Sequence, residues 1–337
     1  MQRGRETCGL FDKPFVSWRD DIALFIGTAQ VARSVPDGNT LVVAAAGGVT
    51  LDADLTRVEF TRVDTSRGTS TSSRAFADVS GQQGAALRVN PGDTVRFKHN
   101  DIADLERVLK NSREKYDGAM IVADGVFSMS GDILNLPPII ELAKKYNIHF
   151  TLLSSDFVFD GKTGNYSETD KPNPLSVYGK SKWLAEQELL KDDYTNWAIA
   201  RTIIVYGQGH NLNKGNIFTW LISELSAGRE VSLITDHFRA PTWAEDLAEA
   251  CLRIVAKQAK GIYHLSGPET LSIFDIGVRI ANYLGVSETL IKASDSKLLN
   301  QAAPRPPKTG FNLAKAKMEL DYSPHPIEET LDSLQNE

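Results

Sequence analysis

The chain has 337 residues, of which 42% are hydrophobic and 24% charged, and its formal net charge is −6 at pH 7. This composition is ordinary for a soluble globular protein, and the length suffices for one large α/β domain or two smaller ones. The negative charge argues against a surface for nucleic acid or for an anionic membrane. The two cysteines, Cys8 and Cys251, predict neither a disulfide framework nor a metal site, and they fit a reducing cytoplasm. The chain also shows no signal-peptide core and no apolar run of about 18 residues, so no membrane span is expected.

Residues 25–46 are expected to form a short helix, a Pro-Asp-Gly turn and a buried strand at Leu41–Ala45. Gly47 and Gly48 follow this strand and are the candidate cofactor contacts of a dinucleotide loop. Such a loop uses the spacing GxxGxxG, which lets the backbone approach a pyrophosphate at a helix N-terminus. The third glycine is missing here, so a simple turn is the alternative, and we expect weak binding of NAD(P)H.

Residues 56–97 alternate polar and apolar side chains, which indicates β-strands. The stretch TSRGTSTSS between them is expected to be a loop. The turn sequence Asn90-Pro91-Gly92-Asp93 indicates an antiparallel hairpin. Arginine dominates the basic residues of positions 1–100 and lysine those of positions 101–337. This change suggests either a domain boundary or a chain joined from different sources.

Residues 98–150 have a βα pattern that can add to a parallel sheet. Asp101 is expected to cap a helix that runs to about Lys115, with Leu105, Val108 and Leu109 on one face. A strand at Ala119–Ala123 and a helix that ends at Tyr146 complete the pattern.

Residues 154–182 carry the clearest chemical signal. They follow a predicted buried strand, Ile148–Leu153, and two prolines keep the loop before Ser176 out of helix. On the helix that starts there, Tyr178 and Lys182 lie one turn apart on one face.

This spacing suits proton transfer. A phenol with a pKa near 10 is a poor acid at neutral pH, and a nearby ammonium group lowers that pKa. The hydroxyl of Ser155 or Ser154, at the carboxyl end of the strand, can bond the oxygen of a carbonyl that is being reduced. Tyr and Lys at this spacing alone are more often a solvated helix face. The complete arrangement of strand, Ser-Ser-Asp, loop and helix favours a reductase site.

Residues from about 148 to 335 resemble the extended short-chain dehydrogenase/reductases, and most of all the dTDP-4-dehydrorhamnose reductase branch. That branch carries STDYVFDG and PLNVYGKTK, where this chain has SSDFVFDG and PLSVYGKSK. The resemblance implies that Ser155 replaces the catalytic threonine, that Tyr178 is the proton donor, and that Lys182 assists it and binds the ribose of NADP or NAD. It also places Asp156 beside the substrate.

Two later positions bear on the substrate. The branch packs a tryptophan on the sugar where this chain has Ile204, so a deoxysugar is not implied. The segment DHFRAPT resembles DQxGxPT, and this match implies that Arg239 contacts a phosphate of a nucleotide sugar, which a planar guanidinium suits. An ordinary loop arginine is the alternative.

We therefore expect an α/β fold with a doubly wound, Rossmann-like parallel sheet. The expected domains are an atypical segment 1–97 and a reductase region 98–335, with a small C-terminal substrate lobe at about 205–335. The expected function is NAD(P)-dependent reduction of a carbonyl on a small, sugar-nucleotide-like substrate, and a homodimer is left open.

Two other readings stay open. The first is a non-catalytic subunit that resembles the β regulatory subunit of methionine adenosyltransferase. The second is a mosaic chain without a working cofactor site. In that reading, residues 25–55 resemble tripartite-tricarboxylate-type periplasmic binding proteins, and residues 98–150 resemble the pyridoxal-phosphate α-oxoamine synthases. The aspartate that the synthases need on their next strand is absent here, so pyridoxal phosphate is not implied.

Overall fold

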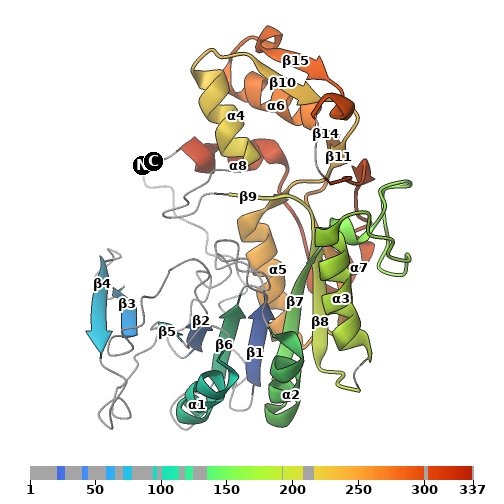
Figure 1. The fold of residues 1–337 in the computed structure, drawn as a ribbon. Helices are drawn as coiled ribbons and strands as arrows, with labels where there is room; N and C mark the ends of the chain where they lie inside the picture. The colour runs from blue at the N-terminus through green and yellow to red at the C-terminus, as the bar shows by residue number, and fades with distance from the viewer. Residues whose placement is uncertain are drawn as a thin grey trace.

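The structure is a computed structural model. It combines a parallel sheet flanked by helices with a smaller lobe beyond the carboxyl ends of the strands (Figure 1). No helix of the described part is long and apolar enough to cross a membrane. The structure describes residues 21–26, 40–44, 58–64, 71–77, 94–96, 101–113, 118–123, 135–191, 193–207, 216–299 and 303–335.

The main sheet has seven strands in the order β13-β8-β7-β1-β6-β2-β5, and every neighbouring pair is parallel. All residues of β7 are buried, as expected of a strand that is covered on both faces. The strands are β1 (Asp21–Ile26), β2 (Thr40–Ala44), β5 (Thr94–Arg96), β6 (Gly118–Ala123), β7 (His149–Ser155), β8 (Trp197–Thr202) and β13 (Gly261–Leu265).

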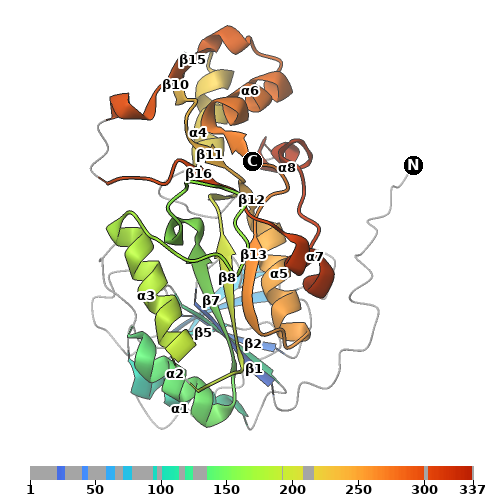
Figure 2. The same cartoon turned by 90° about the vertical axis from the view of Figure 1, so that its right-hand side faces the viewer.

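Helices cover both faces of this sheet (Figure 2). One face carries α1 (Ile102–Arg113), α2 (Leu136–Tyr146) and α3 (Val177–Lys191), and the other carries α5 (Ala244–Ala256) and α7 (Ala314–Leu320). Alternate residues of β7 feed the two cores: Phe150 packs with the first group and Leu153 with the second. The expected cap of α1 is present, because Oδ1 of Asp101 accepts the backbone N–H of Asp104 at 2.9 Å.

The smaller lobe has its own apolar core, to which Phe218, Ile276 and Leu331 belong. It lies beyond the carboxyl ends of the main strands (Figure 1). Its helices are α4 (Ile217–Ser226), α6 (Ile273–Leu284) and α8 (Ile327–Gln335), and its paired strands are β10 (Val231–Ile234) and β15 (Ile291–Ser294). Short strands form two further small sheets, β14-β11-β16 and β12-β9, which pair with no described strand of the main sheet. They are β9 (Val205–Tyr206), β11 (Phe238–Arg239), β12 (Thr242–Trp243), β14 (Leu271–Ser272) and β16 (Lys308–Thr309). The observed fold is thus the expected α/β type with a parallel, Rossmann-like sheet.

The early β-region pairs differently from the prediction. The antiparallel hairpin consists of β3 (Val58–Asp64) and β4 (Thr71–Ala77), so the end of the expected Ser/Thr-rich loop lies in a strand. The strand after the predicted Asn90–Asp93 turn, β5, instead pairs in parallel with β2. Polar Ser and Thr side chains are tolerated in a strand that is paired at its backbone, which explains why composition alone misplaced this element.

The first strand also differs from the prediction. A strand at Leu41–Ala45 was expected to open the dinucleotide unit, but β1 precedes it and lies between β6 and β7. The strand that precedes Gly47 and Gly48 is β2. It lies next to β5, which is the outermost strand at that side of the described sheet. Residues 25 and 26 belong to β1 rather than to a helix. The apolar run of β1 is the signal that the expectation overlooked.

Candidate active site

Ser155 is the last residue of β7, and it caps the short 3₁₀ turn Asp156–Val158. Its Oγ accepts the backbone N–H of Phe157 at 3.2 Å and donates to Oδ1 of Asp156 at 2.9 Å. Neighbouring residues of a strand point to opposite faces, so Ser154 points away from this turn. The hydroxyl of Ser154 is buried and has no hydrogen-bond partner in the described structure. Ser155 is therefore the serine that lies at the candidate site.

The motif Tyr-Gly-Lys places a glycine where α3 touches this turn. A Cβ atom on Gly179 would lie 2.2 Å from the carbonyl oxygen of Phe157, so no larger residue fits without a shift of the backbone. The first turn of the helix is held by Oγ of Ser176, which accepts the N–H of Gly179 at 3.1 Å. This close approach brings the ring of Tyr178 edge-on to Phe157, with ring centres 5.6 Å apart.

The phenol of Tyr178 lies beside Ser155, although 49% of the residue is exposed. Burial of the phenol raises its pKa, the side chain of Ser155 opposes this shift, and the carboxyl of Asp156 adds to it. Nζ of Lys182 lies 6.0 Å from the centre of the Tyr178 ring. The net direction is therefore upward, because burial dominates, and the predicted lowering of this pKa by the Lys182 ammonium stays a prediction. A protonated phenol is nevertheless the form that can donate a proton to a carbonyl.

Asp156 lies under Ser155 and is 1% exposed. Its Oδ2 accepts a hydrogen bond from the hydroxyl of Thr309 and lies 3.9 Å from Nε of Arg239. Burial raises the pKa of Asp156, while Arg239, Thr309 and Ser155 oppose that shift. Its carboxyl is thus turned into the protein rather than toward the surface where a substrate would approach.

Arg239 is 3% exposed, and its guanidinium meets the protein interior. Nη2 donates to the carbonyl of Pro306 at 2.6 Å, and Nη1 donates to the carbonyls of Phe238 at 2.7 Å and Pro307 at 3.2 Å. The structure therefore shows a guanidinium that is neither on the surface nor open to a phosphate. The predicted phosphate contact has no support in this arrangement, and it stays a prediction.

Ile204 lies just after β8 with a φ of 25°. A β-branched residue in this region is strained, and such strain is found most often at functional sites. Its carbonyl accepts the N–H of Thr242 at 3.1 Å, which holds the turn. Ile204 packs against both the sheet core and the lobe core, so it stands at their junction. Gly47 and Gly48, the candidate cofactor contacts, lie outside the described residues.

Thr309 and Phe157 contribute to this site although sequence reasoning gave them no role. Phe157 stands at the tyrosine position of the STDYVFDG motif, and the motif match gave it no role. Thr309 follows a proline-rich loop and carries no local signal that links it to Asp156. Only the pairing of β11 with β16 brings it there.

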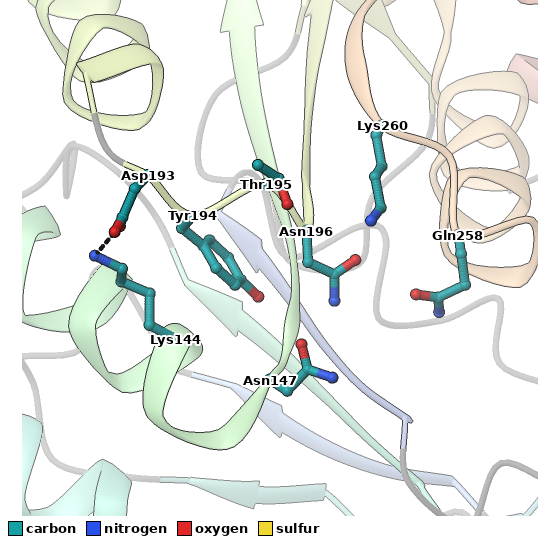
Figure 3. Close-up of a pocket in the computed structure, with 8 residues that line it drawn as sticks. All are labelled: Lys144, Asn147, Asp193, Tyr194, Thr195, Asn196, Gln258 and Lys260. Carbon is teal, nitrogen blue, oxygen red and sulfur yellow. Dashed lines mark ion pairs between the residues drawn. The ribbon is translucent and has the colours of Figure 1, made fainter.

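A cavity of about 440 Å³ lies at the opposite end of the sheet, where strands β7, β8 and β13 begin. Figure 3 shows the amides of Asn147, Asn196 and Gln258 around this space, and Lys144 paired with Asp193 at 2.7 Å. The cavity precedes the strands whose far ends carry Ser155, so it forms no part of the candidate active site. Its lining residues are Lys144, Asn147, Asp193, Tyr194, Thr195, Asn196, Gln258 and Lys260.

Comparison with solved structures shows the fold. A dTDP-4-dehydrorhamnose reductase from Bacillus anthracis, in complex with NADP, aligns over 88% of this chain and 99% of its own, with a TM-score of 0.64 and 18% identity.

Among curated proteins, the probable low-salt glycan biosynthesis reductase Agl14 of Haloferax volcanii is 32% identical over 190 residues, which are 56% of this chain and 63% of the relative. Methionine adenosyltransferase 2 subunit beta of Danio rerio is 29% identical over 194 residues, 55% of this chain and 59% of the relative. The chain thus spans less than two thirds of each of these curated relatives.

A second similarity covers the middle of the chain. Residues 82–185 match the family model of aminotransferase class I and II. The 8-amino-7-oxononanoate synthase of Treponema denticola is 55% identical over 60 residues, which are 18% of this chain and 15% of that enzyme. The predicted resemblance of residues 98–150 to the α-oxoamine synthases agrees with these matches, whereas the predicted resemblance of residues 25–55 stays a prediction.

The family of the C-terminal part follows from the remaining match. Residues 136–337, more than half of the chain, match the model of the RmlD substrate binding domain. This range contains Ser155, Tyr178 and Lys182 as well as the complete smaller lobe. The chain belongs to the RmlD substrate binding domain family.

Proposed function

We propose that this chain is a reductase that uses NADPH or NADH to reduce a carbonyl on a sugar-nucleotide-like substrate. The observation that carries the proposal is the position of Tyr178 beside Ser155 at the carboxyl end of β7, with Lys182 one helical turn away. Ligands of open parallel sheets bind at this edge. The family match and the reductases among the relatives agree with this chemistry.

The chain's residues would divide the work as follows. A bound nicotinamide cofactor supplies the hydride that adds to the carbonyl carbon. The hydroxyl of Ser155 bonds the carbonyl oxygen and positions it against Tyr178. Tyr178 transfers its proton to that oxygen as the charge develops, and Lys182 stabilises the resulting phenolate.

The described residues fit the nicotinamide end of such a cofactor. The carboxyl ends of β1 and β7 are adjacent, because Ile26 pairs with Leu152, and Tyr178 is 49% exposed beside this edge. Lys182, half-buried on the same helix face, would contact the ribose. We propose in addition that residues 98–335 form the reductase region and that the lobe from about residue 205 holds the substrate, with Ile204 facing it.

A second candidate is a non-catalytic subunit. The similarity to methionine adenosyltransferase 2 subunit beta favours it, because that relative is named as a subunit and matches nearly the same share of the chain as the reductase Agl14. Such a protein would keep the helix with Tyr178 and Lys182 and would not turn over a sugar nucleotide.

The test combines a cofactor titration with a turnover assay. NADPH and NADH are first titrated by calorimetry, and consumption of either is then followed with a panel of nucleotide-sugar ketones. Turnover that Tyr178→Phe abolishes supports the reductase. Cofactor binding without turnover of any ketone supports the subunit. Absence of binding supports the mosaic reading, in which the N-terminal segments build no nucleotide loop.

A further inference from the structure

A buried polar cluster lies directly beneath Ser155 and reaches into the C-terminal part of the chain. Its members are Asp156 at 1% exposure, Arg239 at 3% and Thr309 at 0%. One carboxyl oxygen of Asp156 accepts from Ser155, and the other accepts from Thr309 and faces Arg239. Buried polar groups are costly unless they are paired, so this arrangement fixes the carboxyl tightly.

The position of Thr309 is itself fixed by the backbone around it. The N–H of Lys308 donates to the carbonyl of Gly161 at 3.1 Å, and the N–H of Tyr166 donates to the carbonyl of Gly310 at 2.8 Å. Gly161 has a φ of +75°, and a Cβ atom there would lie 2.6 Å from Cβ of Pro306. The loop after the catalytic strand and the segment around Thr309 are therefore joined on both sides of the threonine.

The direction of one hydrogen bond gives Asp156 control over the Ser155 hydroxyl. Ser155 has one hydroxyl proton, and it points to Asp156. The oxygen of Ser155 accepts the N–H of Phe157, and a substrate carbonyl would compete with Asp156 for the Ser155 proton. A rotation of the Asp156 carboxyl would therefore change the direction of the Ser155 hydroxyl.

We propose that Asp156 is a positioning residue for Ser155, and that Thr309 and Arg239 hold its carboxyl in the orientation that catalysis needs. This inference rests on the proposed reductase function. It makes the C-terminal segment part of the catalytic apparatus, because Thr309 reaches the site only when β16 is paired with β11. It also gives Arg239 a role that needs no contact with a phosphate.

Thr309→Val tests the proposal, since it removes the hydroxyl and nearly preserves the shape. Thr309→Ser is the rescue variant, because it keeps the hydroxyl. Thr330→Val is the matched control: Thr330 is 3% exposed and donates to the carbonyl of Ile327 at 2.7 Å, far from Asp156. Each variant is assayed for kcat, KM, cofactor affinity and melting temperature with the ketone that the wild-type chain reduces.

We expect Thr309→Val to lower kcat at least about tenfold, equivalent to about 1.4 kcal/mol of barrier, with cofactor affinity unchanged. The acid limb of its pH–rate profile should move to higher pH, because Asp156 loses a donor to its charged form. The charged and titratable groups that face this carboxyl are Tyr178 from α3 and Arg239 from β11, with Arg305 acting on Arg239. Thr309→Ser should restore most of the rate, and Thr330→Val should retain it.

Equal kcat values and pH profiles for Thr309→Val and Thr330→Val would overturn the proposal while leaving the reductase function intact. If the wild-type chain reduces no ketone, the proposed function fails, and the positioning claim is read by NMR of the carboxyl carbons. Thr309→Val should then raise the titration midpoint of Asp156, and Thr330→Val should not. An unchanged midpoint would overturn the claim that Thr309 holds this carboxyl.

Discussion

The ring of Tyr178 at the start of α3 packs edge-on against Phe157 in the 3₁₀ turn after β7, with ring centres 5.6 Å apart. The contact exists because Gly179 lets the helix approach the turn that Ser155 caps. Residues on two different elements thereby lie together at the sheet edge where ligands of open parallel sheets bind.

Tyr178→Phe should abolish turnover and leave cofactor affinity nearly unchanged. The substitution removes one hydroxyl and keeps the ring against Phe157, and a general acid typically contributes about 100- to 10,000-fold in rate. Steady-state kinetics and a calorimetric titration measure the two effects. Activity at the wild-type level would mean that Tyr178 is not the acid.

Lys182→Met should lower both the rate and the affinity for NAD(P)H, since the ammonium is assigned to the phenolate and to the ribose. Lys180→Met is the control, because Lys180 is exposed and lies on the same helix. The two variants are compared by kcat and by fluorescence titration of the cofactor. Similar values for both would assign Lys182 to the solvated face of α3.

Gly179→Ala should separate α3 from the turn. The added methyl group meets the carbonyl of Phe157, which is backbone and cannot rotate away, so we expect about 1–3 kcal/mol of destabilisation together with a loss of kcat. Urea unfolding and kinetics measure both. Glu188→Ala is the control, because it introduces the same residue on the outer part of α3, and it should retain the rate. Wild-type stability and activity in Gly179→Ala would refute the close approach of α3 to the turn.

Glu186 and Arg201 form a buried, bidentate ion pair between α3 and β8, at 2.6 Å and 3.0 Å. Glu186→Gln leaves the guanidinium without its counter-charge and should cost about 3–5 kcal/mol in free energy of unfolding. Glu188→Gln breaks the exposed pair with Lys191 and should cost less than about 1 kcal/mol. Denaturant titrations of both variants make the comparison, and equal losses would contradict it.

His325 and Asp246 tie the segment before α8 to the start of α5. The bond to Asp246 raises the pKa of His325 above its ordinary value of 6.5. Because the folded pKa is the higher one, this pair stabilises the fold fully below pH 6.5 and loses that contribution as the pH rises through the folded pKa. The difference in urea midpoint between wild type and His325→Gln should therefore be larger at pH 5.5 than at pH 9. The imidazole is half-exposed, so salt should weaken the effect.

The sequence by itself determined the helices α1 to α3 and the strands β6 and β7 within a few residues, because their apolar periodicity and caps are local properties. Asp101 shows this for a cap and Leu105 for a buried face. The candidate pair was also readable, since Tyr178 and Lys182 share a helix and their spacing alone places them on one face.

The tertiary structure decided what depends on contacts between distant segments. The position of β1 between β6 and β7, the burial of Arg239 and the bond from Thr309 to Asp156 all depend on which strands pair. Pairing is set by the packing of whole elements, whose energies are summed over many residues and leave no local sequence signal. The pKa of Tyr178 is the clearest case: the sequence shows a lysine one helical turn away, whereas only the fold shows the burial that raises this pKa.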